Sequence, residues 1–411
     1  MLLAMTSCSG GYKASIKDGS YTPGEGGGGS YYSGDEGEGY ESEPAVPGGE
    51  PGVGEEPPEE PVDKTVPAGQ LTCSALDDNE HYDYWKTLAN STQEGQGIFQ
   101  GYKEKFAFNT YHRLDLTIKN GNYVQVKIKG EETYACVDNL SKAYLFAKED
   151  KENYDIEITY LDKDNKEQKV EKTVTNGEEI DLESVHENAN LLEIMFVIDA
   201  TGSMGDEMTY IKSEIDDVIS KVKEENKGAT ISLAMMVYRD EGDEYVTKYN
   251  DFTQNIAAQQ SFLSKQSANG GGDFEEAVDV ALKEAINKQW SSKSTKLLFH
   301  VADAPAHDEK VSSWNESALL AAKKGIKIIS VASSGIDKKT EYFFRSQSLL
   351  TAGQYVYLTN HSGIGGEHLD ATIDVELTVE FLNACLTRLI NGYYSGTFAE
   401  PVPYYQSQQQ Q

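Results

Sequence analysis

A nearly uninterrupted apolar run, LLEIMFVID at residues 191–199, constrains the fold of this chain more than any other feature. A strand with one face in water alternates apolar and polar side chains, whereas this run presents apolar side chains to both faces. Two similar runs follow, ISLAMMVY at 231–238 and TKLLFHVAD at 295–303. Strands of this kind lie at the centre of a mainly parallel sheet that helices cover on both sides.

Segments with helical spacing alternate with these runs. A helix is expected directly after the first run, because apolar side chains recur on one helical face at Met208, Ile211, Ile215, Val218 and Val222. Further helices are expected over 254–266, 274–289, 313–324, 338–349 and 376–391. Further strands are expected at 244–252 (an edge strand), 326–333 and 354–359. This alternation predicts an α/β fold with a doubly wound, Rossmann-like sheet over residues 190–395.

The preceding part of the chain has a different pattern of apolar and polar residues. Between residues 104 and 185, segments such as RLDLTIK and YDIEITYLD alternate apolar and polar residues, and turn sequences such as NGN and DKDNKE separate them. Short, evenly spaced strands of this kind predict a small antiparallel β-sandwich. We assign residues 67–189 to this sandwich and to an arm around Trp85, and we expect residues 396–411 to form a flexible tail.

The first 66 residues do not have the composition of a folded domain. Residues 9–66 are rich in Gly, Pro, Ser and Glu, with no Lys or Arg between Asp18 and Asp63, which predicts a disordered acidic linker. Residues 1–8, MLLAMTSC, are similar to the end of a bacterial lipoprotein signal, in which Cys8 would carry the lipid, although the charged start of such a signal is missing. The resemblance implies a lipid-anchored protein of the bacterial cell envelope that faces the periplasm or the exterior. A plain solvated tail explains the composition equally well.

Charge and cysteine content exclude several classes of partner. The net charge is −32, so the chain is repelled by nucleic acid and by anionic lipid, and contact with a membrane is expected only through a lipid anchor. No apolar window reaches the roughly 18–20 residues that span a bilayer. The four cysteines form no CxxC pair, which argues against a zinc cluster. Their spacing leaves open whether Cys73 and Cys136 pair.

Oxygen-bearing side chains follow the buried strands. Asp199 ends the first strand and is followed by Thr201 and Ser203, Asp303 ends the strand at 295–303, and Asp273 lies in the glycine-rich segment NGGGDFEE. The carboxyl ends of parallel strands meet at one edge of a sheet, so these five residues can converge there. Hard oxygen ligands favour Mg²⁺, with Ca²⁺ or Mn²⁺ as alternatives. Any one of these residues alone would be explained as a helix cap or a turn residue.

Together, these residues resemble a known metal site. The order Asp199-Ala-Thr201-Gly-Ser203, followed later by Asp303, makes residues 190–395 similar to a von Willebrand factor type A (VWA) domain. That family carries a metal-ion-dependent adhesion site (MIDAS) written Asp-x-Ser-x-Ser. The resemblance implies that Thr201 and Ser203 ligate the ion directly, Asp199 directly or through water, and Asp303 as the later aspartate. Asp273 stands where the family has a threonine, in GGGDFEE instead of the GGGDxPE of one branch.

The resemblance implies recognition without catalysis. In the family, a carboxylate of the ligand completes the coordination of the ion, so we expect a protein or glycan ligand in an adhesion-type surface protein. Asp240, Glu241 and His307 are expected to border the ligand face. Two alternatives remain: a structural assembly module of a surface complex, and a metal-dependent hydrolase that would use His307 or Asp308 as a general base.

Overall fold

The computed structural model describes residues 66–90, 97–106, 108–184 and 189–407. The predicted lipid attachment site at Cys8 and the predicted linker up to residue 65 lie outside the described residues. Within the described ranges, no helix is both long enough and apolar enough to cross a membrane.

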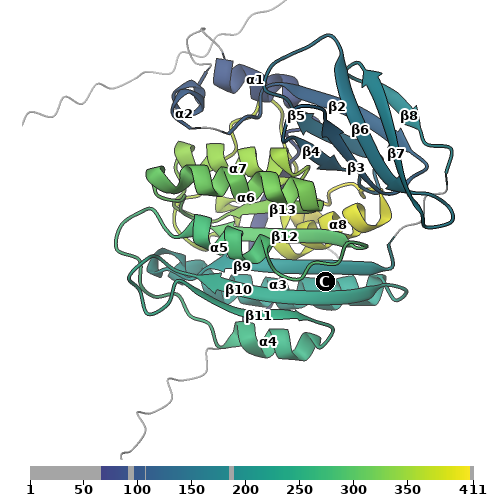
Figure 1. The fold of residues 1–411 in the computed structure, drawn as a ribbon. Coiled ribbons are helices and arrows are strands. Elements are labelled where there is room, and N and C mark those ends of the chain that lie inside the picture. The colour runs from purple at the N-terminus through teal and green to yellow at the C-terminus, as the bar shows by residue number, and fades with distance from the viewer. Residues whose placement is uncertain (1–65, 91–96, 107, 185–188, 408–411) are drawn as a thin grey trace, which may run out of the picture. The chain divides into compact units, whose positions relative to one another are not determined.

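The main sheet has eight strands in the order β11-β10-β9-β12-β13-β14-β1-β15 (Figure 1). Five neighbouring strands run parallel: β9 (Leu191–Asp199), β10 (Thr230–Tyr238), β12 (Thr295–Ala302), β13 (Ile326–Ala332) and β14 (Tyr355–Leu358). One edge is the antiparallel strand β11 (Thr247–Thr253), and the other end holds the antiparallel strands β1 (Thr72–Leu76) and β15 (Glu380–Phe381). The predicted α/β fold with a mainly parallel sheet is confirmed.

Helices cover both faces of this sheet, as the apolar strands require. On one face lie α3 (Gly205–Glu225), α4 (Ile256–Ser264) and α8 (Leu382–Ser395), and on the other lie α5 (Val278–Ile286), α6 (Val311–Lys324) and α7 (Lys338–Leu350). Strand β9 contributes side chains to both faces: Ile194 and Phe196 pack in the core beneath α3, while Met195 and Val197 pack in the core beneath α5. The alternate side chains of one strand thus join two separate cores.

The predicted sandwich consists of two small sheets with one shared core. One sheet has the order β5-β2-β8 and the other β4-β3-β6-β7. Their strands are β2 (Arg113–Lys119), β3 (Asn122–Ile128), β4 (Tyr134–Cys136), β5 (Lys142–Phe146), β6 (Tyr154–Leu161), β7 (Glu167–Val174) and β8 (Glu179–Asp181). Buried side chains from both sheets, among them Leu116, Val126 and Ile156, form one cluster. All strand pairs are antiparallel except β2 with β8, which is parallel.

The arm between β1 and the sandwich packs on α7 of the main domain. It contains α1 (Tyr82–Asn90) and α2 (Gln100–Lys105). The Trp85 ring stacks on Tyr342 with the ring centroids 6.0 Å apart and an interplanar angle of 9°. Beside it, the buried Arg345 guanidinium pairs with Asp78 at 2.6 Å and with Glu341 at 2.9 Å. The arm is therefore fixed by stacking and by a fully paired buried charge.

Strand β1 precedes the sandwich in the chain but lies between β14 and β15 in the main sheet. The carboxylate of Glu214 on α3 accepts hydrogen bonds from the backbone N–H groups of Gly69, Gln70 and Leu71 at 2.8, 2.7 and 3.0 Å. The predicted domain boundary at residue 190 therefore does not match the structure. Strand β1 comes before this boundary in the chain but belongs to the same sheet as the strands that follow it. The sandwich is an insertion between the strands of one sheet.

The end of the chain also differs from the predicted flexible tail. The Phe398 ring packs edge-on against Tyr393 with centroids 5.1 Å apart, and the Tyr404 N–H donates to the Val379 carbonyl at 2.9 Å. A short helix, α9 (Tyr404–Ser407), follows. The aromatic packing and this hydrogen bond offset part of the chain entropy that is lost when the segment is ordered.

A truncation tests the role of β1. A chain of residues 190–411 lacks Leu71, Cys73 and Leu76, which are fully or almost fully buried. Their loss should cost about 5 kcal/mol of unfolding free energy, comparable to the whole stability of many domains. We expect no cooperative thermal unfolding for this chain, measured by circular dichroism, and a sharp transition for residues 66–411. A sharp transition at the same temperature in both chains would show that β1 is dispensable.

Candidate functional site

Four of the five predicted ligands come together at the carboxyl ends of β9 and β12. Asp199 is the last residue of β9, and Asp303 follows β12. The two strands are parallel neighbours, so these ends lie at the same edge of the sheet. The chain then turns from β9 into α3 through a short 3₁₀ segment (Gly202–Met204), which carries Ser203 past the edge.

Hydrogen bonds link these side chains. Both the backbone N–H and the hydroxyl of Thr201 donate to Asp199 Oδ1, at 2.9 and 2.7 Å. The hydroxyls of Thr201 and Ser203 lie 3.2 Å apart, and Ser203 is hydrogen-bonded to Asp303. The Asp-x-Thr-x-Ser sequence is thus folded into one group of oxygen atoms.

Several carboxylate oxygens of this group have no hydrogen-bond partner. Asp199 Oδ2 and Asp303 Oδ1 are buried without a donor, and so is Oε2 of Glu276, which precedes α5. The three residues are 0%, 4% and 2% exposed. A buried carboxylate oxygen without a donor or a cation is costly, so each of these oxygens favours a nearby cation, but the three do not form a set whose donor atoms all lie within 4.8 Å of one another.

The pKa values of these groups are raised. Burial raises the pKa of the Asp199 carboxyl, and the neighbouring charge of Asp303 raises it further. Burial likewise raises the pKa of Asp303. For Glu276, burial together with the charges of Asp199 and Asp240 raises the pKa to about 9. Without a cation, the group therefore retains protons that isolated carboxyl groups would lose.

The glycine-rich loop before α5 packs directly on the Asp199 segment. The Gly202 N–H donates to the Gly270 carbonyl at 3.1 Å, and the Gly271 N–H donates to Asp243 Oδ2 at 2.9 Å. Gly270 and Gly271 have φ values of +82° and +76°, and a Cβ atom on Gly270 would lie 2.4 Å from the Asp243 carboxylate. The positive φ values and these close approaches favour glycine at positions 270 and 271.

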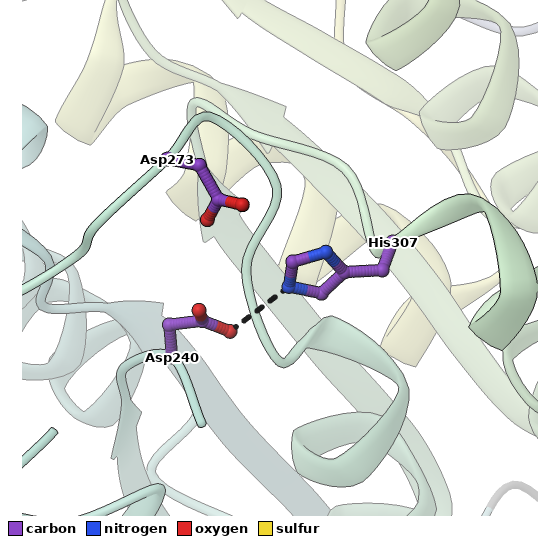
Figure 2. A group of neighbouring side chains, drawn as sticks. All are labelled: Asp240, Asp273 and His307. Atoms are coloured by element: carbon purple, nitrogen blue, oxygen red, sulfur yellow. Dashed lines mark hydrogen bonds and ion pairs between the residues drawn. The ribbon is translucent and has the colours of Figure 1, made fainter. Parts of the chain in front are cut away.

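The fifth predicted ligand, Asp273, lies in a different group. Within the described residues, Asp240, Asp273 and His307 are the one set of three acidic or histidine side chains whose donor atoms all lie within 4.8 Å of one another. Figure 2 shows the three side chains directed toward a shared space. His307 Nε2 and Asp240 Oδ1 are 3.2 Å apart. Asp273 is exposed, and the structure does not bring it into such a set with Asp199 and Asp303.

This second group contains two of the three residues expected at the ligand face. Partial burial opposes the charging of His307, but the hydrogen bond with Asp240 and the charge of Asp273 outweigh it and raise the pKa of the imidazole. The third residue, Glu241, forms an exposed ion pair with Lys310 at 3.2 Å. The group is acidic overall and could hold a cation through two carboxylates and one imidazole nitrogen.

Glu276 was not predicted from the sequence. Its backbone N–H donates to the Pro305 carbonyl at 2.9 Å, and Glu276 forms an isolated parallel bridge with Ala306. This bridge holds it beside the segment that follows β12. A sequence signal was present: Glu276 comes directly before Ala277 and Val278, where the buried face of α5 begins.

A buried histidine and the cysteines lie outside both groups. His300 is fully buried, and its partners are side chains: the Tyr238 hydroxyl at 3.1 Å and Gln347 Nε2 at 3.0 Å. Burial lowers its pKa to about 3. Cys73, Cys136 and Cys385 are all free, so no Cys73–Cys136 bridge is formed.

Residues 193–369 match the family model described as von Willebrand factor A domain. These residues run from β9 to the segment that follows β14 and include every residue of both side-chain groups described above. The chain contains a von Willebrand factor A domain. The similarity inferred from the Asp-x-Thr-x-Ser motif is thus confirmed for the domain itself.

Two curated proteins are similar to part of this chain. The alpha-protein kinase vwkA of Dictyostelium discoideum is 28% identical over 194 residues, which is 46% of this chain and 30% of the kinase. An ariadne-like RING finger protein, R811, of Acanthamoeba polyphaga mimivirus is 24% identical over 190 residues, 42% of this chain and 19% of that protein. The chain therefore spans less than a third of the length of either relative.

Solved structures that resemble the chain include two bacterial proteins. BatB of Bacteroides thetaiotaomicron aligns with a TM-score of 0.32 and 15% identity, covering 40% of this chain and 89% of BatB. The open conformation of the pilus adhesin SpaC of Lactobacillus rhamnosus GG aligns with a TM-score of 0.35 and 11% identity, covering 66% of this chain and 33% of SpaC.

The raised pKa of Glu276 predicts a pH-dependent stability. An unfolded glutamate titrates near 4.5 and the folded one near 9, so the folded state holds a proton that the unfolded state has lost. The stabilisation is complete below the unfolded pKa and is lost as pH rises through the folded pKa. As pH rises from about 5 to about 7 with chelator present, the titration of Glu276 should lower the unfolding free energy by about 3 kcal/mol, measured by urea denaturation. Glu276→Gln should remove this part of the slope.

Glu275→Gln is the matched control for this measurement. Glu275 pairs with Lys339 at 2.7 Å, and that hydrogen bond lowers its pKa, so its contribution is already complete above the ordinary glutamate pKa. Glu275→Gln should therefore keep the slope of the parent. If Glu276→Gln and the parent showed the same slope, the buried, protonated state of Glu276 would be disproved.

Proposed function

We propose that the VWA domain binds a divalent cation, Mg²⁺ in the first place, and uses it to bind a carboxylate of a protein or glycan ligand. The observation that carries this proposal is the set of buried carboxylate oxygens of Asp199, Asp303 and Glu276 that have no donor. Asp199, Thr201, Ser203 and Asp303 would hold the ion, with Ca²⁺ and Mn²⁺ as alternatives. A bound divalent ion supplies positive charge and a coordination position for a ligand oxygen.

The exposures of these residues support a role in recognition. Asp199 and Thr201 form the buried part of the group, whereas Ser203 is exposed at the surface. Asp240 and His307, which are 3.2 Å apart, would border the ligand. The surrounding charge is acidic, so an acidic ligand gains from the domain only if a cation lies between them. This dependence on the ion is the main consequence of the proposal.

The proposal extends to the place of the protein. A lipid on Cys8 and an acidic linker over 9–66 would present the described domains at a bacterial cell envelope, in the periplasm or outside the cell. The support is the Ser-Cys-Ser-Gly sequence followed by a long segment of linker composition. No turnover is part of the proposal. A hydrolase remains the alternative that the His307–Asp240 hydrogen bond favours, and cleavage of p-nitrophenyl phosphate that is lost in His307→Ala would support it.

Calorimetric titration with MgCl₂ tests the ion site. The parent chain should bind one ion, and Asp303→Asn should weaken binding by about 100-fold or more, because the substitution removes a charged ligand. Asp206→Asn is the matched control, since Asp206 is an exposed acid in the first turn of α3 and should leave the affinity unchanged. Absence of binding to Mg²⁺, Ca²⁺ and Mn²⁺ at millimolar concentration would refute the site.

The same titration decides between the two side-chain groups. If the ion binds at Asp199 and Asp303, Asp240→Asn and Asp273→Asn should change the affinity only a few-fold. If both of these variants lose the ion while Asp303→Asn keeps it, the ion belongs to the group of Asp240, Asp273 and His307. The adhesion-type site at the ends of β9 and β12 would then be wrong.

Capture on coated surfaces tests the recognition step. Immobilised gelatin and hyaluronan serve as a protein and a glycan that carry carboxylates. We expect one of the two surfaces to retain the parent in Mg²⁺ and to release it in chelator. The variant Asp303→Asn should not be retained on either surface. Equal retention in chelator and by Asp303→Asn would favour the assembly module, in which the ion only stabilises the loops. No retention on either surface would contradict binding to both ligand classes.

A further inference from the structure

A cavity of about 400 Å³ lies at the opposite end of the main sheet from the acidic site. Lys296 near the start of β12 and Lys327 near the start of β13 belong to its lining, and the sandwich supplies the facing wall. β12 extends from this cavity to the segment of Asp303, so roughly 20 Å separates the two ends. The cavity is therefore a separate place from the proposed ion site.

The charge of this cavity is opposite to that of the chain. Its lining includes the lysines Lys288, Lys296, Lys323, Lys324 and Lys327, and Asp138 is the one acidic residue among the described residues that line it. The whole chain has a net charge of −32, so a cluster of lysines around one cavity stands out from the rest. Such a concave, positively charged lining attracts anions.

Three of these lysines have no carboxylate ion pair among the described residues. Lys327 pairs with Asp138 at 3.1 Å, and Lys288 pairs with Glu284 at 3.0 Å. In contrast, the ammonium group of Lys296 donates to the Ser294 carbonyl at 3.3 Å, and that of Lys324 donates to the Ile286 carbonyl at 2.8 Å. A carbonyl satisfies one donor of an ammonium group but does not neutralise its charge.

Lys296 is the most informative of them. It is only 8% exposed. Burial lowers the pKa of its ammonium group, and the nearby charge of Lys327 lowers it further, although Cys136 and Glu193 oppose this. A lysine held in such a place without a paired carboxylate leaves room for a negative group from outside the chain.

Part of the remaining wall is apolar, beside polar residues such as Ser291 and Thr295. Ile118, Val124 and Tyr393 are almost fully buried, and Trp290 is partly exposed. The Trp290 N–H is already bonded to the Ala285 carbonyl at 2.9 Å, so the indole contributes an apolar surface and no free donor. A ligand with an anionic group and an apolar part would match both the lysines and this apolar part of the wall.

We propose that this cavity binds a small organic anion in which a carboxylate or a phosphate is joined to an apolar group. Lys296 and Lys324 would bind the anionic group, and Trp290 and Val124 would contact the apolar part. A volume of about 400 Å³ suits a ligand of metabolite size.

The position of the cavity ties its occupancy to the contact between the sandwich and the VWA domain. Gln125 Nε2 of β3 donates to the Lys323 carbonyl at 2.8 Å, and Cys136 Sγ of β4 donates to the same carbonyl at 3.4 Å. On the other side, Asn139 Nδ2 donates to the Tyr394 carbonyl at 2.8 Å. A bound anion would add contacts to both partners and would stabilise this interface.

Binding of 8-anilinonaphthalene-1-sulfonate to the full chain tests the proposal, because this fluorescent probe has an anionic group and an apolar part. We expect one saturable site, with affinity reduced by at least about tenfold in Lys296→Met and in Lys324→Gln. Lys223→Gln on α3 is the matched control, because Lys223 is exposed and does not line the cavity. Circular dichroism identifies any variant that fails to fold. Because Lys324 is only half-buried, Lys324→Gln still tests the proposal if Lys296→Met does not fold.

Competition then separates the two sources of the anionic group. Displacement of the probe by octanoate assigns the cavity to carboxylates, and displacement by phenyl phosphate assigns it to phosphates. Inorganic phosphate should compete more weakly than phenyl phosphate, since it lacks an apolar part. Absence of saturable binding, or equal binding by the parent and both cavity variants, would overturn the proposal.

Discussion

The site of this VWA domain is built around two carboxylates that are buried at the ends of neighbouring parallel strands. Parallel pairing of β9 and β12 places Asp199 and Asp303 at the same edge, so the topology itself enforces their proximity. A buried charge must be neutralised, either by a proton or by a cation. The hydroxyls of Thr201 and Ser203, the glycine-rich loop and Glu276 are all arranged around this pair. In the proposed function, a proton and a cation would therefore compete for the same edge of the sheet.

The sequence predicted those parts of the site that directly follow a buried strand. Where an apolar run ends, the position of the next side chain is fixed by the sheet, and Asp199, Thr201, Ser203 and Asp303 follow this rule. The loop before α5 has no such constraint, because spacing along a loop does not determine which way a side chain turns. Asp273 is exposed beside Asp240 and His307, whereas Glu276, three residues later, is buried through its bridge to Ala306.

The same reasoning explains what was and was not predicted of the fold. The central strands are apolar on both faces, and this local property is sufficient to identify a parallel α/β sheet. Strand β1 has only five residues, and its partner in β14 is far away in the chain: the hydroxyls of Thr72 and Thr359 lie 2.8 Å apart although the residues are separated by 287 positions. Pairing over such a distance leaves no periodic signal in the sequence.

The place of β1 has a mechanical consequence. The chain passes through the main sheet before it enters the arm and the sandwich, so tension applied ahead of Val66 reaches the sheet first. There β1 is flanked by antiparallel neighbours on both sides, and Glu214 binds the backbone just before it. Hydrogen bonds perpendicular to a strand share a load along its axis instead of breaking one after another. A pull from that side would therefore be resisted by shear in the main sheet before it reaches the sandwich.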